Sequence, residues 1–202
     1  METITSHIGI DLDNTIICYD KSFYKVGVEH GLIPYHVGAT KTEIKAYLTS
    51  LPEGQYQWET LQGLVYGKQI GQATLFGGVL SFLDTALVGK KKRVSIVSHK
   101  TVLAHHDPDQ TNLRDTAISF LKENAVIAPD RLAINDVYFC KTLEEKVQKI
   151  SALNCSVFVD DLAKVFQHPE FPTSCRPLLF RGQGQSFPCF PSWEHIHHEV
   201  FT

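Results

Sequence analysis

Short apolar runs rich in β-branched residues recur along the chain, and each of them ends in polar residues. Such runs are typical of buried parallel strands. The runs that predict strands are 8–10, 94–97, 136–139, 157–159 and 177–180. The segments whose apolar spacing or flanking residues predict helices are 78–88, 113–124 and 143–152. Strands that alternate with helices indicate an α/β fold on a doubly wound parallel sheet.

Residues 23–75 show another pattern, in which helical spacing is broken by glycine and proline and no strand is convincing. The helical patterns in this stretch cover 23–30, 42–48 and 58–70. We interpret the stretch as a small helical cap inserted after the first strand of an α/β core formed by 1–22 and 76–202. Residues 181–202 are rich in glycine, proline and aromatic residues, and we expect them to pack irregularly across the core.

Composition narrows the function classes. The 202 residues carry a formal net charge of −3, and the single basic run, 90–93, is interpreted as a solvated turn, so no nucleic-acid partner is expected. No signal peptide is visible, and no apolar run approaches the ~20 residues that span a membrane. Five scattered cysteines without a CxxC pair are typical of reduced thiols, which predicts a cytoplasmic protein. The sequence leaves its oligomeric state open.

Two aspartates, Asp11 and Asp13, follow the first predicted strand two positions apart. Residues i and i+2 of a strand point to the same side, so both carboxylates are expected in one small volume. Like charges this close need compensation, and a hard cation such as Mg²⁺ supplies it. The alternative is an N-cap or an Asx-turn at the point where the strand ends.

Further polar residues follow the other predicted strands. Ser98 directly follows the strand over 94–97, and Asp160 and Asp161 follow the strand over 157–159. Functional groups gather at the carboxyl ends of strands in a parallel α/β sheet, so these side chains are expected at one edge. On its own, the aspartate pair also fits a helix N-cap.

Together these residues resemble the haloacid dehalogenase (HAD) superfamily of phosphohydrolases. The stretch Asp11-Leu12-Asp13-Asn14-Thr15 matches its first motif, and Ser98 matches the second. A lysine followed downstream by the 160–161 aspartates matches the third and fourth. The resemblance covers about residues 6–22 and 76–165, and it implies a HAD-like Rossmannoid core.

The resemblance also implies roles. Asp11 would be the nucleophile that forms an aspartyl-phosphate, and Asp13 would be the general acid and base. Mg²⁺ would be held by Asp11, by the backbone carbonyl of Asp13 and by one of Asp160 and Asp161, of which we favour Asp161. True haloacid dehalogenases lack the second aspartate, so phosphate chemistry is favoured over carbon–halogen cleavage.

The phosphate-binding residues follow in the same way. Ser98 would bind a phosphoryl oxygen, and His99 and Lys100 are candidates for further contacts to an anionic substrate. Lys141 and Lys146 both fit the position of the superfamily's lysine. Lys146 is favoured, because it lies one turn into the helix over 143–152.

The sequence therefore predicts a Mg²⁺-dependent phosphatase acting on a small-molecule phosphomonoester, such as a nucleotide or sugar phosphate. The alternatives are a phosphotransferase or phosphomutase of the same superfamily, and a non-catalytic binding protein on this fold. A glycosyltransferase that binds metal through its DxD motif would explain Asp11 and Asp13 but not the other residues as a set.

Overall fold

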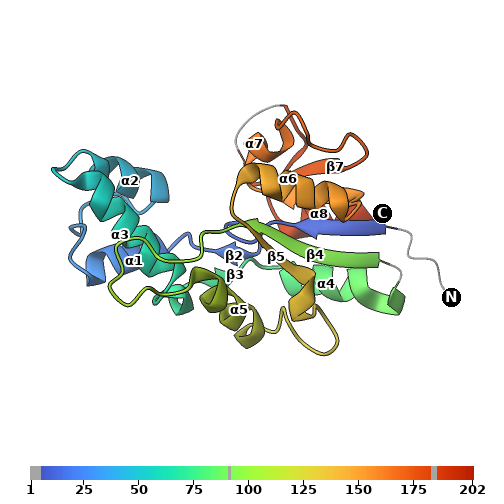
Figure 1. The fold of residues 1–202 in the computed structure, drawn as a ribbon, viewed down its shortest axis with the longest axis horizontal. Coiled ribbons are helices and arrows are strands. Elements are labelled where there is room, and N and C mark those ends of the chain that lie inside the picture. The colour runs from blue at the N-terminus through green and yellow to red at the C-terminus, as the bar shows by residue number, and fades with distance from the viewer. Residues whose placement is uncertain (1–5, 91, 183–185) are drawn as a thin grey trace. The chain divides into compact units, whose positions relative to one another are not determined.

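The computed structural model describes residues 6–90, 92–182 and 186–202, and these form two compact units (Figure 1). The α/β unit takes its described residues from 1–17, 75–100 and 122–202. The helical unit consists of Cys18–Thr74 and Thr101–Leu121.

A six-stranded parallel sheet in the order β5-β4-β1-β6-β7-β8 forms the centre of the α/β unit. Its strands are β1 (Ser6–Ile10), β4 (Lys92–His99), β5 (Val137–Cys140), β6 (Val157–Asp160), β7 (Arg176–Phe180) and β8 (Cys189–Phe190). From β1 the chain adds β4 and β5 on one side, then returns to add β6, β7 and β8 on the other. The doubly wound α/β fold predicted from the sequence is confirmed, as are its five predicted strands.

The sheet is flanked by helices α4 (Val79–Leu87), α6 (Leu143–Ala152), α7 (Ala163–Phe166) and α8 (Trp193–Phe201). Helix α6 packs on β4 and β5, and α4 packs on β4 and on α8. Thr142 caps the start of helix α6, where its hydroxyl oxygen accepts the backbone N–H of Glu145 at 3.0 Å. Its residues Val147 and Ile150 are fully buried beside Val97 of β4, so the capped start and the apolar face together fix the helix on the sheet.

The prediction that residues 181–202 pack irregularly is wrong. This segment contains β8 and the nine-residue helix α8. Trp193 and Ile196 lie three positions apart on α8, and both are buried. The glycines and prolines that precede the helix obscured this short helical period. Residues 183–185 lie outside the described part of the chain.

The helical unit contains α1 (Ser22–Glu29), α2 (Lys41–Thr49), α3 (Gly54–Tyr66), the 3₁₀ turn Ile70–Gln72 and most of α5 (Leu113–Glu123). The three predicted helices are confirmed, although α3 begins and ends four residues earlier than the sequence indicates. Helix α2 begins with a capping box in which Thr40 and Glu43 each accept a backbone N–H of the other.

Residues 101–121 group with the helical unit, whereas the sequence analysis assigned them to the core. The Thr116 hydroxyl donates to the backbone oxygen of Tyr66 at 3.1 Å, and Lys68 forms a 2.6 Å ion pair with Asp107. Leu113 and Ala117 of α5 are buried. Contacts between residues so distant in the chain leave no pattern in a single sequence.

A two-stranded sheet of β2 (Ile17–Cys18) and β3 (Thr74–Leu75) is an element that the sequence did not predict. Strands of two residues are too short to show a period. The division between the two units runs through both strands.

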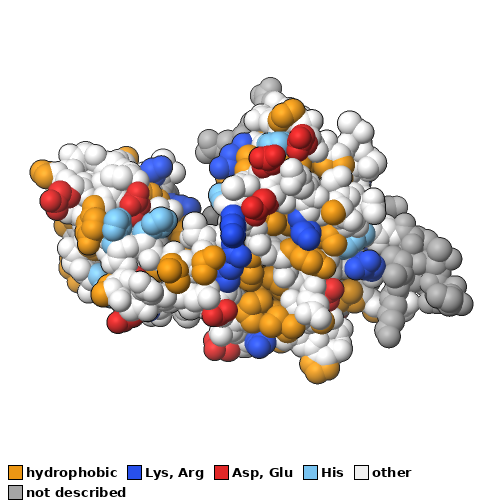
Figure 2. All heavy atoms as spheres, in the orientation of Figure 1, with side chains coloured by type: hydrophobic (Ala, Val, Ile, Leu, Met, Phe, Trp, Pro, Cys, Tyr) orange, Lys and Arg blue, Asp and Glu red, His pale blue; other side chains and the backbone are white. Residues whose placement is uncertain are grey.

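The sequence predicted a solvated turn over the basic run 90–93, but β4 begins at Lys92 and includes Arg93, while Lys91 lies outside the described residues. On the face drawn in Figure 2, lysine and arginine side chains are interspersed with acidic and apolar ones. Within the described ranges, no helix combines the length and apolar character needed to cross a bilayer.

Candidate active site

Asp11 follows β1 at the centre of the sheet and is 5% exposed. Its backbone N–H donates to the backbone oxygen of Val159 at 2.9 Å, which extends the ladder between β1 and β6. The backbone of Asp11 is therefore held against β6 directly after the end of β1. The site begins at the carboxyl ends of the strands, where the winding of the sheet reverses.

A tight turn follows Asp11 and brings the chain back over the end of β1. Asn14 has a φ of 61°, a left-handed conformation that asparagine tolerates better than most residues. The backbone N–H groups of Ile16 and Ile17 both donate to the Leu12 oxygen at 2.9 Å. The turn places the Thr15 hydroxyl 3.4 Å from Oδ2 of Asp11.

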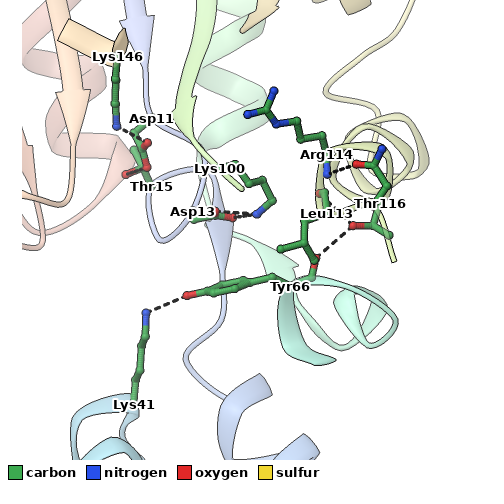
Figure 3. A network of polar contacts seen from close by, with 11 residues as sticks. Asp11, Asp13, Thr15, Lys41, Tyr66, Lys100, Leu113, Arg114, Thr116 and Lys146 are labelled. Atoms are coloured by element: carbon green, nitrogen blue, oxygen red, sulfur yellow. Dashed lines mark hydrogen bonds and ion pairs between the residues drawn. The ribbon is translucent and has the colours of Figure 1, made fainter. Parts of the chain in front are cut away.

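Lys146 contacts aspartates at the ends of two neighbouring strands, β1 and β6. It lies on α6, its side chain is 3% exposed, and its Nζ donates to Oδ1 of Asp11 at 2.5 Å and to Oδ2 of Asp160 at 2.6 Å. Figure 3 shows this lysine extending toward Asp11. Of the two lysines that the sequence left open, Lys146 is therefore the one beside Asp11.

Asp160 and Asp161 complete an acidic cluster with Asp11, in which one oxygen of each carboxylate lies within 4.8 Å of the others. Asp160 is fully buried, and its second oxygen, Oδ1, accepts the Leu162 backbone N–H at 2.9 Å. Asp161 is half-buried. Both carboxylates thus contact the site, and the two oxygens of Asp160 already have partners within the protein.

Burial shapes the electrostatics of Asp11 and Lys146. Burial raises the pKa of Asp11 to about 7; the positive charge of Lys146 opposes this effect, and the negative charge of Asp160 adds to it. For Lys146, burial favours the neutral amine, but Asp11 and Asp160 outweigh it and raise the pKa above its usual value. The lysine is therefore a fixed cation, and a further positive charge would favour the carboxylate form of Asp11.

Asp13 pairs with Lys100, which directly follows β4. Nζ of Lys100 lies 2.7 Å from Oδ2 and 3.0 Å from Oδ1 of Asp13 (Figure 3). The lysine side chain is 3% exposed, whereas that of Asp13 is 21% exposed. The structure thus places Lys100 on the second aspartate of the first motif.

Ser98 is 1% exposed at the end of β4. Among the described residues, its Oγ is a buried polar atom without a hydrogen-bond partner. A buried hydroxyl without a partner is costly and calls for an explanation, such as a ligand. The atom is available to an oxygen of a bound anion.

His99 and Lys141 lie at the edge of this arrangement. His99 is exposed, and its Nε2 contacts the backbone oxygen of Lys141 at 2.9 Å. Lys141 is also exposed, and its backbone N–H donates to the Glu145 carboxylate at 2.7 Å. The His99 ring and the Lys141 backbone thus form hydrogen bonds that hold the segment before α6.

Trp193 is a supporting residue that sequence reasoning missed. Its Nε1 donates to the backbone oxygen of Thr15 at 2.9 Å, and its indole lies between Phe82 and Phe180, at centroid distances of 4.9 and 5.8 Å. Helix α8 thereby holds the turn that follows Asp11. The helical spacing of Trp193 and Ile196 was the only sequence pattern that could have indicated it.

Comparison with known proteins identifies the fold. No protein-family model matches the sequence, and no curated protein matches it. Solved structures do match. A HAD-superfamily hydrolase of subfamily IA from Geobacter sulfurreducens has a TM-score of 0.60 at 10% identity, with 96% of each chain covered. A haloacid dehalogenase-like hydrolase from Streptococcus pneumoniae has a TM-score of 0.59 at 15% identity, with 96% of this chain and 98% of that chain covered.

A HAD family hydrolase from Deinococcus radiodurans, solved with bound phosphate and sodium, has a TM-score of 0.52 at 14% identity, with 92% of this chain and 84% of that chain covered. The arrangement of the sheet is thus that of a Rossmannoid α/β protein. More particularly, the chain has the fold of the HAD-superfamily hydrolases, which confirms at the level of fold the resemblance carried by its motifs.

Proposed function

We propose that this protein is a Mg²⁺-dependent phosphatase that hydrolyses a small-molecule phosphomonoester through an aspartyl-phosphate on Asp11. The observation that carries the proposal is the pairing of Lys146 with both Asp11 and Asp160, beside Asp161 and at the carboxyl edge of the sheet. A buried nucleophile, a fixed cation and an acidic cluster are the groups that phosphoryl transfer requires.

The donor set fits Mg²⁺. The cluster holds three carboxylates, those of Asp11, Asp160 and Asp161, and the ammonium group of Lys146 contacts the first two, so a divalent cation would balance the remaining negative charge. Carboxylate oxygens are the hard ligands that Mg²⁺ prefers. Asp11 and Asp161 would hold the ion by their side chains and Asp13 by its backbone carbonyl, because Asp160 already binds Lys146 and the Leu162 N–H. When bound, Mg²⁺ would neutralise charge on the phosphoryl oxygens.

In the first step, a carboxylate oxygen of Asp11 forms a bond to phosphorus while the bond from phosphorus to the leaving oxygen breaks. Asp13 gives its proton to that leaving oxygen. Lys146 offsets the repulsion between Asp11 and the anionic phosphoryl group, and the Ser98 hydroxyl donates to one of the phosphoryl oxygens.

In the second step, water attacks phosphorus and gives its proton to Asp13. The bond from Asp11 to phosphorus breaks, and Asp11 returns as a carboxylate. Asp13 can serve both steps because it lies outside the Lys146 network and is partly exposed to solvent.

The substrate is proposed to be small because of where the helical unit lies in the chain. This unit begins at Cys18, directly after the turn that carries Asp13 and Thr15. An insertion at this point is suited to select a substrate of limited size. Phosphate bound to the Deinococcus radiodurans hydrolase supports an anionic phosphate ligand. The five cysteines, each a thiol here, are consistent with a cytoplasmic setting.

The test is phosphate release from an aryl phosphate and from a panel of phosphorylated metabolites, with Mg²⁺ and with a chelator. We expect Mg²⁺-dependent release that Asp11→Asn reduces by about a thousandfold or more. Asp130→Asn, which alters an exposed aspartate of the α/β unit, should keep full activity. Release that persists in chelator or in Asp11→Asn would contradict the proposal. Mg²⁺ binding without release would favour a phosphotransferase or a binding protein.

A further inference from the structure

Lys100 is a buried cation that contacts Asp13 and lies outside the cluster of Asp11, Lys146 and Asp160. Its Nζ contacts both carboxylate oxygens of Asp13, at 2.7 and 3.0 Å (Figure 3). Contact to both oxygens restricts rotation of the carboxylate more than contact to one oxygen does. Lys100 therefore defines where the oxygens of Asp13 point.

The end of β4 determines the direction of this lysine. Successive side chains at the end of β4 point to opposite faces of the sheet. Ser98 and Lys100 are therefore buried, whereas His99 between them is exposed. The backbone N–H of Lys100 donates to the Cys140 oxygen at 3.1 Å and continues the ladder to β5. The backbone is thus held on the sheet, and the lysine side chain extends from a fixed base to Asp13.

The difference in exposure argues against a purely stabilising ion pair. The Lys100 side chain is 3% exposed, whereas Asp13 is 21% exposed and can still be hydrated. Removing an ammonium group from water is costly, and the attraction to a partner often does no more than offset this cost. The lasting effect of such a pair is the geometry that it imposes on the partner.

We propose that Lys100 is a positioning residue that orients the Asp13 carboxyl for proton transfer at the reacting oxygens. This inference rests on the proposed function. It replaces the sequence-based expectation that Lys100 contacts the anionic substrate. Lys100 itself neither gains nor loses a proton in either step.

The first chemical step shows what correct orientation contributes. The bond from Asp11 to phosphorus forms as the bond to the leaving oxygen breaks, and that oxygen takes the proton of Asp13. A poor leaving group such as an alkoxide depends on this proton, whereas a dinitrophenolate departs without it. Misplacing Asp13 therefore slows the hydrolysis of esters with poor leaving groups more than that of esters with good ones.

The experiment measures kcat/KM for a series of phosphate esters, from 2,4-dinitrophenyl through phenyl to alkyl phosphate. For Lys100→Met we expect about a 100-fold loss with the alkyl ester and less than about a fivefold loss with the dinitrophenyl ester. Asp13→Asn should show the same trend. Adding Lys100→Met to Asp13→Asn should cause no further dependence on the leaving group.

Inhibition by inorganic phosphate separates positioning from direct substrate contact. If Lys100 positions Asp13, the inhibition constant of phosphate is unchanged in Lys100→Met. An inhibition constant raised tenfold, with all esters slowed equally, would overturn the inference and assign Lys100 to the phosphoryl group. Lys122→Met, which removes an exposed lysine at the end of α5, controls for the loss of one positive charge.

Two further comparisons keep the outcome decisive. Lys100→Arg retains a cation, so we expect a leaving-group dependence between those of wild type and Lys100→Met, and an equal loss with all esters would again overturn the inference. If wild type releases phosphate and Asp11→Asn does not, a uniform loss in Lys100→Met refutes only the role of Lys100. If wild type releases none, the proposed function fails, and this inference fails with it.

Discussion

Two lysines, one in each unit, bridge two aspartates with nearly the same distances but in opposite surroundings. In the α/β unit, Lys146 contacts Asp11 and Asp160 at 2.5 and 2.6 Å with 3% of its side chain exposed. In the helical unit, Lys68 contacts Asp107 and Asp109 at 2.6 Å with 39% exposed. Distance alone does not distinguish the two clusters.

Burial does distinguish them. Among the described residues, the buried side chains of the acidic, basic and histidine types are those of His7, Asp11, Lys100, Lys146 and Asp160, and all of them lie in the α/β unit. In the helical unit, charged and histidine side chains are seen on the surface (Figure 2). A buried charge is costly and stabilises little, so a fold retains it where chemistry requires it, whereas exposed ion pairs contribute little.

The largest expected effect comes from removing Lys146, the buried cation that contacts both Asp11 and Asp160. Lys146→Met leaves two buried carboxylates without their cation, so we expect destabilisation of about 3 kcal/mol and loss of nearly all phosphatase activity. The matched variant is Lys68→Met, for which we expect almost wild-type activity and a much smaller change in unfolding. Denaturant unfolding and kcat on one aryl phosphate measure both. Similar losses in the two variants would contradict the distinction between the clusters.

A smaller effect is expected at the turn that follows Asp11. Trp193→Phe keeps an aromatic ring but removes the N–H that donates to the Thr15 oxygen, which costs about 1–3 kcal/mol and lowers kcat by about tenfold. Trp58→Phe makes the same exchange at a buried tryptophan of the helical unit. It should lower stability with less effect on kcat for a small aryl phosphate. A kcat unchanged in Trp193→Phe would show that α8 does not position the turn.

The smallest expected effect is a pH dependence of stability at His7. Its Nδ1 lies 2.8 Å from the Leu153 oxygen and its Nε2 lies 2.9 Å from the Ser95 hydroxyl. The carbonyl can only accept, so Nδ1 carries the proton of the neutral ring, and Nε2 accepts from Ser95. Burial lowers the pKa of His7 below 6.5.

Because the folded pKa lies below the unfolded one, the contribution of neutral His7 is complete above about pH 6.5 and is lost as the pH falls below it. We expect His7→Gln to flatten the fall in unfolding free energy between about pH 7 and pH 5. His198→Gln, which changes an exposed histidine of α8, should keep the wild-type slope. Equal slopes in all three proteins would refute the assignment.

Much of the site could be predicted because its residues follow strands. Asp11, Ser98 and Asp160 each end an apolar run, and the carboxyl ends of parallel strands meet at one edge whatever the loops do. Lys146 could be favoured over Lys141 because one helical turn separates it from the start of α6. In each case the position of the residue could be predicted from the periodicity of the neighbouring strand or helix.

The remaining features depend on contacts across the chain. The pairing of Lys100 with Asp13 joins residues 87 positions apart, and the contact of Trp193 with Thr15 joins residues 178 apart. Neither contact has a local pattern. For the same reason the grouping of 101–121 with the helical unit could not be predicted, since it depends on contacts such as Thr116 with Tyr66.

The central claim is that Asp11 becomes phosphorylated during turnover, and reductive trapping tests it most directly. Borohydride added during steady-state turnover with Mg²⁺ converts an aspartyl-phosphate to homoserine, which peptide mass spectrometry locates. We predict homoserine at position 11 alone, dependent on substrate, with positions 13, 160 and 161 unchanged. Homoserine at another aspartate, or sustained phosphate release with position 11 never modified, would contradict the account.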